Sequence, residues 1–290
     1  MYCILLSASL FFAAPCDIIR MVIYGRSARK RRLMEKHGEL NGKLFISTTA
    51  DDCREAALRG EVGLEIAEFC WAQRIDLALE KNVARCRELM EGLPRFIFHA
   101  PFAELAPCAI DPRARELAAS RYRQSVRLAE RLGTKRIVIH GGFIPEVYFP
   151  EYYVSESIHF WKRFLRDAPD DIEIMLENVM EPSPDTLVRI ADGVGDPRLG
   201  LCLDVGHANC SVSQTPPLEW IEPMRPHLRH VHIHNNEGDR DLHSPLGSGT
   251  IPMEQVLDTV LEACPRASFT VENIHCRESM DWLADKGYLK

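Results

Sequence analysis

From residue 43 onward, short runs rich in β-branched residues alternate with longer stretches that carry apolar residues at three- and four-residue spacing. The short runs predict strands, and the longer ones, such as 113–132 and 253–263, predict amphipathic helices. Eight strands that alternate with helices predict parallel crossover connections and a closed barrel. The expected strands are Leu44–Thr48, Gly63–Glu68, Arg95–His99, Arg136–His140, Asp171–Glu177, Leu199–Asp204, Arg229–His234 and Ser268–Glu272. The pattern therefore predicts an α/β fold, a single-domain (β/α)8 TIM barrel.

Within the later strands, polar and apolar residues alternate, so they occupy opposite faces. In the fifth expected strand, the sequence IEIMLE over 172–177 places Glu177 on the face opposite the isoleucines. In the seventh, three histidines alternate with Val231 and Ile233. Each strand thus offers an apolar face to the outer helices and points a polar side chain into the barrel at its C-terminal end. That end carries the active site in barrels of this kind.

The first 40 residues differ from the rest of the chain. Residues 4–15 are an apolar run of 12, which is too short to span a bilayer, and no Lys or Arg precedes it as in a signal peptide. Met21 and Met34 are alternative starts. Three interpretations stay open: an upstream-extended start, a weak export signal, or a loosely attached segment. We divide the chain into an N-terminal extension over 1–40 and a catalytic barrel over 41–290.

The composition is that of an ordinary globular protein, with 46% hydrophobic and 27% charged residues among 290, which excludes a disordered or collagen-like chain. A net charge of −7 argues against a generally basic nucleic-acid binder and leaves a local basic groove open. The ten cysteines are scattered, without a C-x-x-C pair. This spacing favours reduced, mostly buried thiols and a cytoplasmic location.

Imidazoles and carboxylates recur at the ends of the expected strands and in the loops that follow. A lone histidine there is commonly a core residue, and a lone carboxylate is commonly a helix N-cap. Carboxylates repeated at successive strand ends would repel one another across the barrel mouth unless a cation neutralised them. The ligand types suit a divalent ion, Mn, Co, Mg or Zn, and argue against a structural cysteine–zinc site. The candidates are His99, His140, Glu177, Asp204, His207, His232, Asp241, His243 and Glu272.

From about residue 44 to 285 the chain resembles the xylose isomerase-like barrel superfamily, which includes sugar-phosphate isomerases/epimerases and the family 2 apurinic endonucleases. The most specific matching motifs are DVGH at 204–207 and HIHNN followed by DLHSPLGSG within 232–249. The other matching segments are FHAPF (98–102), VIHGG (138–142), LENV (176–179) and VEN (271–273).

The resemblance implies two schemes of metal binding. In the isomerases and epimerases, one divalent ion is held by the residues that match Glu177, Asp204, His232 and Glu272. In the endonucleases, three zinc ions use five further ligands, which match His99, His140, His207, Asp241 and His243. The fourth expected strand ends in HGG where the endonucleases have His-Pro-Gly, and DVGH lacks their cysteine before the histidine. We therefore favour a metal-dependent sugar or sugar-phosphate isomerase/epimerase, with a zinc-dependent phosphodiester hydrolase as the alternative.

In the favoured hypothesis a divalent ion polarises the carbonyl of an open-chain ketose, while Glu177 and Glu272 remove and return a proton from opposite sides. His99, His140, His207 and His234 are expected to contact the substrate. The expected partner is a small carbohydrate, with no nucleic acid and no membrane. The resemblance also implies a homo-oligomer of unspecified size. A metal-binding barrel without catalytic activity is a third, less favoured class.

Two loops remain open to more than one interpretation. The segment LGSGTIP at 246–252 could hold a phosphate on backbone N–H groups, although a plain glycine turn into a helix is favoured. The segment 142–157 contains five aromatic residues and predicts a long loop after the fourth strand. A lid over the barrel mouth and an oligomer contact fit that loop equally well.

Overall fold

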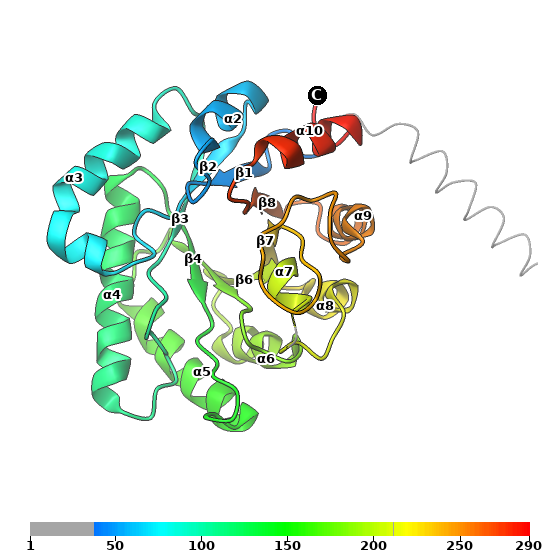
Figure 1. Ribbon diagram of the computed structural model, residues 1–290. Coiled ribbons are helices and arrows are strands. Elements are labelled where there is room, and N and C mark those ends of the chain that lie inside the picture. The colour runs from blue at the N-terminus through cyan, green and yellow to red at the C-terminus, as the bar shows by residue number, and fades with distance from the viewer. Residues whose placement is uncertain (1–37, 211) are drawn as a thin grey trace, which may run out of the picture. The chain divides into compact units, whose positions relative to one another are not determined.

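The protein was examined as a computed structural model, which describes residues 38–210 and 212–290. Its eight strands are all parallel, and each pairs with the next in the chain until β8 pairs with β1, which closes a barrel (Figure 1). The predicted (β/α)8 barrel is confirmed. The strands are β1 (Leu44–Ser47), β2 (Gly63–Ile66), β3 (Phe96–His99), β4 (Arg136–His140), β5 (Glu173–Glu177), β6 (Leu199–Asp204), β7 (Leu228–Ile233) and β8 (Ser268–Val271).

Helices connect successive strands along the outside of the barrel (Figure 1). The expected helix at 253–263 matches α9 at both ends, and the expected helix at 113–132 differs from α4 by one residue at each end. The helices are α2 (Cys53–Gly60), α3 (Gln73–Met90), α4 (Pro112–Arg131), α5 (Pro150–Arg166), α6 (Asp185–Val194), α7 (Val205–Ala208), α8 (Pro217–Met224), α9 (Met253–Ala263) and α10 (Arg277–Asp285).

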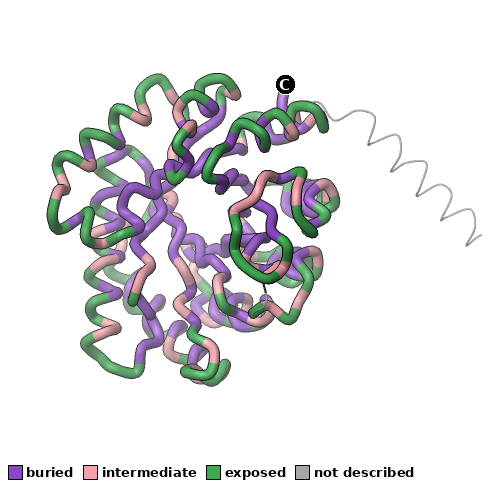
Figure 2. Tube along the Cα trace, viewed as in Figure 1, coloured by how far each residue is buried: buried purple, intermediate pink, exposed green. Residues whose placement is uncertain are grey.

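The two faces of the strands have separate cores. Outward-facing side chains such as Ile174 and Val231 join the large apolar cluster between the strands and the helices. Inward-facing side chains form a second, smaller cluster, which contains Phe45, Ile97, Val138, Met175 and Cys202. The strands and the inner helix faces are buried, while the outer helix faces are exposed (Figure 2). The predicted alternation is therefore present, and the inner cluster is the floor on which the polar strand ends lie.

Local sequence explains where the outer helices begin. Asp111 caps α4, since its carboxylate accepts a hydrogen bond from the Arg113 amide at 2.7 Å. Pro112 is in the first turn, where a missing N–H costs nothing because that group has no partner within the helix. The helix then buries Tyr122, whose ring stacks on Trp161 of α5 at a centroid distance of 5.7 Å. Burial of each such side chain contributes about 1.5–3 kcal/mol.

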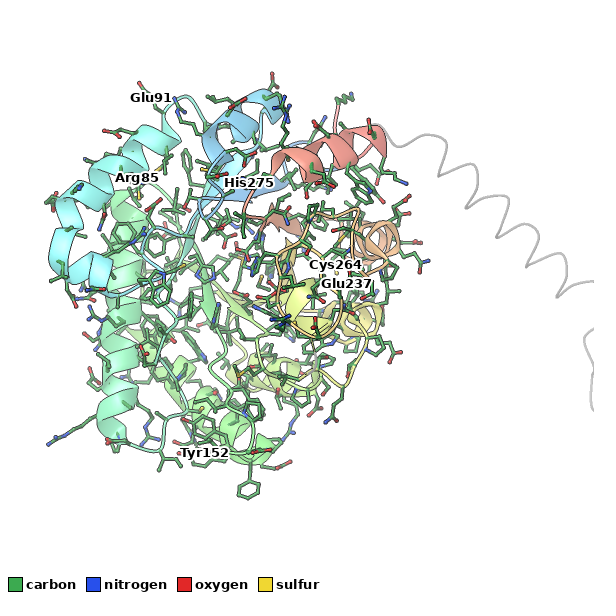
Figure 3. All side chains as sticks on the ribbon, in the orientation of Figure 1. Arg85, Glu91, Tyr152, Glu237, Cys264 and His275 are labelled. Atoms are coloured by element: carbon green, nitrogen blue, oxygen red, sulfur yellow. The ribbon has the colours of Figure 1, made fainter. Side chains whose placement is uncertain are left out.

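The loop within the aromatic segment 142–157 is shorter than the sequence predicts, because the second half of the segment is helical. Pro150 begins α5, so Tyr152 and Tyr153 are helical residues and not part of a loop; Tyr152 lies near one end of the helix (Figure 3). Proline favours the first position of a helix as much as it favours a turn, which is why the pattern was ambiguous. Tyr153 is buried, and its hydroxyl donates to Glu181 Oε1 at 2.8 Å.

The described part of the chain contains no helix that is both long and apolar enough to cross a membrane. All its cysteines are free, and only Cys210 is not fully buried, as the scattered spacing predicted. Leu40 is buried, and its amide bonds to the Tyr288 carbonyl at 3.0 Å. The interpretations of residues 1–37 lie outside the described residues.

Candidate metal centre

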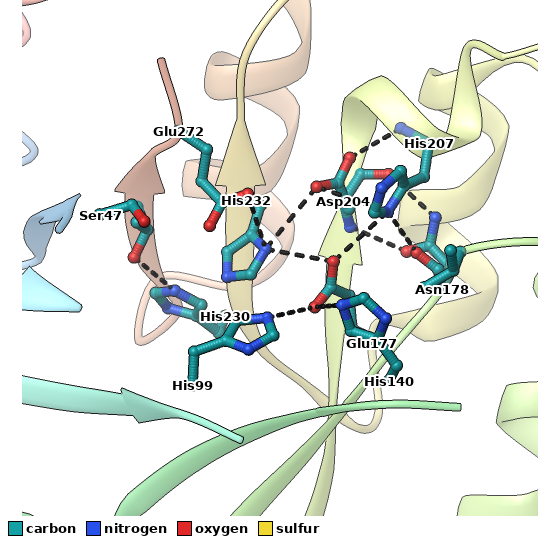
Figure 4. Close-up of polar contacts among 12 residues, drawn as sticks. Ser47, His99, His140, Glu177, Asn178, Asp204, His207, His230, His232 and Glu272 are labelled. Atoms are coloured by element: carbon teal, nitrogen blue, oxygen red, sulfur yellow. Dashed lines mark hydrogen bonds and ion pairs between the residues drawn. The ribbon is translucent and has the colours of Figure 1, made fainter. Parts of the chain in front are cut away.

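Four consecutive strands bring four side chains to one point at the C-terminal end of the barrel. His232 Nδ1 lies 3.4 Å from Glu177 Oε1, 3.6 Å from Asp204 Oδ2 and 3.6 Å from Glu272 Oε2 (Figure 4). All four residues are buried. These are the residues that the sequence predicted as ligands of a single divalent ion, and the structure brings all of them together.

The unpaired nitrogen and the three carboxylates of this group are suited to bind a cation. His232 Nδ1 is buried and has no hydrogen-bond partner among the described residues, while Nε2 of the same ring contacts Glu65 Oε1 at 3.0 Å. A buried polar atom without a partner is unusual, and a carboxylate on the far nitrogen is the common support of a metal-bound imidazole. Three carboxylates gathered around the free nitrogen supply the charge that a divalent ion neutralises.

The side-chain amide of Asn178 holds the backbone of Asp204. Its amide donates to Asn178 Oδ1 at 2.8 Å, and Asn178 Nδ2 donates to its carbonyl at 2.9 Å. Asp204 also caps α7, because Oδ1 accepts the His207 amide at 2.7 Å. The D-x-x-H motif is therefore a capped helical turn that leaves Oδ2 directed at His232 and sets His207 beside the same site.

A second group of ligating atoms surrounds the other oxygen of Glu177. His99 Nε2 lies 3.2 Å and His140 Nε2 3.4 Å from Glu177 Oε2. Nδ1 of His99 is 2.9 Å from the Ala100 carbonyl, to which Nδ1–H donates, so Nε2 is the ring atom that an ion beside Glu177 would use.

A third group forms where the loop after β7 folds over the mouth. Asp241 Oδ2 lies 2.8 Å from His243 Nε2 and 3.3 Å from His207 Nε2. In both imidazoles Nδ1–H donates to a backbone carbonyl, that of Glu272 for His243 and that of Asn178 for His207. All five residues expected only for a three-metal site thus lie in the same cluster as the first four.

Burial and mutual charge set the ionisation of this cluster. Burial alone would raise the pKa of the Glu177 carboxyl, but the neighbouring His140 and His232 hold that pKa well below its usual range. Burial likewise opposes ionisation of Asp204, whose pKa His207 and His234 nevertheless hold well below the usual value. In return, Asp204 and Asp241 raise the pKa of His207 well above its usual value in spite of burial. Asp241 likewise raises the pKa of His243 to about 9 in spite of burial. An ion that binds these rings would displace their protons.

One predicted substrate-contacting residue belongs to the cluster itself and not to the cavity wall. His234 is buried and does not line the cavity above the cluster; its Nε2 lies 3.1 Å from Asp204 Oδ1. Its ring stacks on His243 with centroids 4.0 Å apart. His99, His140 and His207 do line the cavity.

Two residues of the site were missed from the sequence. Glu65, in the middle of β2, is fully buried and also accepts from the Thr270 hydroxyl at 2.6 Å and contacts His230 Nε2 at 3.1 Å. The same alternation that marked the later strands places Glu65 on the inner face, and that signal was available. Asn178 directly follows Glu177, which ends β5. Its role is to hold the backbone of Asp204 on β6, so no local pattern marks it.

The loop over 246–252 is a structural turn. The amides of Leu246, Ser248 and Thr250 donate to Ser279 Oγ, the Pro245 carbonyl and the Asn236 carbonyl, at 2.9–3.0 Å. A side chain at Gly249 would overlap Asn235 and Asn236, so this glycine permits close packing, and its φ of +77° also favours glycine. The favoured interpretation, a glycine turn into α9, agrees with these contacts.

A cavity of about 660 Å³ lies over the cluster, with Glu177, Glu272, His207 and Asp241 on its polar side. Residues from the loops after β3, β4 and β5 form most of the rest of its wall, and Thr49, Ala67, Cys70 and Ala114 complete it. The size is within the range typical of small-molecule sites, about 300–1,000 Å³. The arrangement can bind a cation at its floor and expose two carboxylates to a small molecule.

Sequence comparison finds relatives of this chain among known proteins. An uncharacterized protein of Methanocaldococcus jannaschii is 29% identical over 212 residues, which cover 69% of this chain and 72% of that protein. A probable endonuclease 4 of Mycobacterium marinum is 25% identical and covers 59% of this chain and 70% of its own.

Solved structures show the same fold. A D-tagatose 3-epimerase-like protein superposes with a TM-score of 0.71 at 24% identity, over 84% of this chain and 96% of that one. A Thermus thermophilus protein soaked with zinc chloride superposes with a TM-score of 0.67 at 22% identity, over 84% and 97% of the two chains. The sequence profile of one family matches residues 56–286. The chain belongs to the xylose isomerase-like TIM barrel family.

Proposed function

We propose that this protein is a divalent-metal-dependent isomerase or epimerase of a sugar or sugar phosphate, which transfers a proton next to a carbonyl. The observation that carries the proposal is the pair Glu177 and Glu272, whose carboxylates lie 3.4 and 3.6 Å from the unpartnered His232 Nδ1 and line the cavity. Similar folds include a D-psicose 3-epimerase and a 3-keto-D-glucoside 4-epimerase, which supports this chemistry.

The two glutamates divide the proton transfer. They come from β5 and β8, with β6 and β7 between them, so they approach the cavity floor from different sides. One carboxylate removes the proton from the carbon beside the carbonyl, and the other returns it on the opposite face. Glu177, Asp204, His232 and Glu272 would hold the divalent ion, which would supply Lewis-acid polarisation of the carbonyl. His207 is placed to hydrogen-bond a substrate hydroxyl.

Solvent proton exchange tests the proposal. In D2O the protein with added Mn²⁺ is incubated with a panel of ketoses and their phosphates, and deuterium incorporation is followed by NMR. We expect exchange into one substrate, and its loss in Glu177→Gln. Glu173→Gln is the matched control, since Glu173 lies on the same strand face at the other end, where it pairs with Arg136 at 2.6 Å. Exchange that persists in Glu177→Gln, or no exchange with any member, would refute the assignment.

The third ligand group favours one second candidate, a zinc-dependent phosphodiester hydrolase. Asp241 Oδ2 is shared between His207 Nε2 and His243 Nε2, an arrangement that the single-ion scheme does not use. Multi-metal sites clamp the attacking and leaving oxygens of a phosphodiester. Three zinc ions per chain, together with chelator-sensitive cleavage of abasic DNA, would establish this activity in place of the isomerase.

A further inference from the structure

The cavity over the metal centre has two chemically different sides. The carboxylates and imidazoles of the candidate metal centre occupy one side, and an apolar wall, interrupted by Glu104, occupies the other. The wall comes from three successive loops, those after β3, β4 and β5. Its members are Phe102, Leu105, Ala106, Ala109, Phe143, Ile144, Tyr148, Val179 and Met180.

We infer, on the basis of the proposed function, that the substrate is an unphosphorylated keto sugar that carries an apolar substituent. Its carbonyl and hydroxyl groups would face Glu177 and Glu272, and its substituent would lie against the apolar wall. Such a substrate matches both sides of the cavity, whereas a bare sugar phosphate matches only one.

The apolar wall begins next to the ligating side chains. The Phe102 ring stacks on His140 with centroids 4.5 Å apart and planes 12° from parallel. A sugar carbon chain held at the glutamates therefore has an aromatic face beside it. Farther out, Ile144 and Met180 line the cavity and are each 43% exposed, so both keep apolar surface that a ligand can cover.

The described lining residues offer a phosphate no lysine or arginine, and the histidines among them belong to the candidate metal centre. The wall includes neither lysine nor arginine within 38–210 and 212–290. The glycine-containing turn after β7 uses the amides of Leu246, Ser248 and Thr250 within the fold. Phosphate groups are commonly held by arginine, lysine or free amides at a helix start. The volume of about 660 Å³ also leaves room beside an open-chain sugar for a second group.

Calorimetric titration of the Mn²⁺-treated full chain tests the inference with three probes. These are D-fructose, 6-O-benzyl-D-fructose and D-fructose 6-phosphate, which share one keto sugar and differ only at O6. We expect the benzyl ether to bind at least about tenfold more tightly than fructose, because the ring covers the wall. Fructose 6-phosphate should bind no more tightly than fructose. Equal binding of fructose and its benzyl ether, tighter binding of the phosphate, or no binding of any probe would overturn the inference.

A pair of variants locates the contact. Ile144→Asn should remove most of the preference for the benzyl ether over fructose. Val147→Asn is the control, because Val147 lies in the same loop, is 55% exposed and does not line the cavity. Equal losses in the two variants would also refute the assigned wall. These titrations measure affinity and not proton exchange, so a failure here is distinct from the absence of proton exchange that would refute the isomerase.

Discussion

Glu65 Oε1 lies 3.0 Å from His232 Nε2, and this contact fixes which nitrogen of the ring faces the three carboxylates. With Nε2–H donating to Glu65, His232 Nδ1 keeps its lone pair toward the centre. Glu65 is itself held by the Thr270 hydroxyl and by His230. Glu65, three strands away from His232 in the closed barrel, thus orients a proposed metal ligand without belonging to the proposed ligand set itself.

Glu65→Gln is expected to weaken metal binding about 10- to 100-fold, since it removes the charged partner of His232 and leaves the four ligands in place. Competition with a fluorescent chelator measures the dissociation constant. Glu173→Gln, at the opposite end of the barrel interior, should leave the constant unchanged. Unaltered affinity in Glu65→Gln would show that His232 is oriented by its packing alone.

Removal of the divalent ion is expected to destabilise the fold. The carboxylates of Glu177, Asp204 and Glu272 are gathered at one point, and an ion at 100 times its dissociation constant contributes about 2.7 kcal/mol. Thermal unfolding with Mn²⁺ and with excess chelator measures the difference. Asp204→Asn retains a residue that can cap α7 and should abolish the difference between the two conditions. A stabilisation that survives in this variant would place the ion elsewhere.

Gly206→Ala is expected to disturb the centre from outside its ligand set. A methyl group at this position would overlap the His234 ring, which contacts Asp204. Overpacking of this kind costs about 1–3 kcal/mol, and we expect metal affinity to fall with it. Gly60→Ala is the control, since the added methyl would meet only the flexible end of Met280. Urea unfolding and chelator competition measure both effects, and equal results for the two variants would contradict the expectation.

Glu181 gives a pH dependence that is separate from the metal centre. Burial raises the pKa of this carboxyl above its usual value, in spite of hydrogen bonds from the Val179 amide and the Tyr153 hydroxyl. A raised folded-state pKa means that the folded chain binds more protons, so this group's contribution to stability is lost as pH rises from about 4.5 through the raised value.

Glu181→Gln should remove that loss. Relative to the unmodified protein, the variant should gain free energy of unfolding between pH 5 and pH 8, as measured by urea denaturation at both values. The comparison cancels the other titrating groups, because only residue 181 differs. A difference between the two proteins that stays constant with pH would show that Glu181 titrates normally.

The sequence predicts the elements well because one simple rule holds: the strands turn an apolar face to the outer helices, and the later strands end in an inward polar residue. The rule identified the ends of β4 and β6 without error. It placed the start of the fifth strand at residue 171, two residues before β5 begins at Glu173. Ile172 continues the apolar alternation and is buried, although it precedes the paired part of the strand. The sequence places Pro150 within a loop, whereas it begins α5, because proline is common at the start of helices as well as in turns.

The convergence of the candidate ligands could be predicted for a different reason. Glu177, Asp204 and His232 stand at or near strand ends, and closure of a parallel barrel brings all such ends to one mouth. Alternation places Glu65 on the inner face, but its pairing with His232 depends on barrel closure, and the contact of His234 with Asp204 depends on the close approach at Gly206. The apolar wall combines three loops, and their adjacency follows only from the folded barrel.

The pairing of β8 with β1, through Leu44 with Phe269 and Ile46 with Val271, has a consequence for biosynthesis. Glu272 directly follows β8, the last strand to be synthesised and the one that closes the barrel. On a translating ribosome, the first three ligands would leave the exit tunnel before the fourth. We therefore expect the nascent chain to acquire its ion only after the barrel has closed, so that metal loading marks completion of folding.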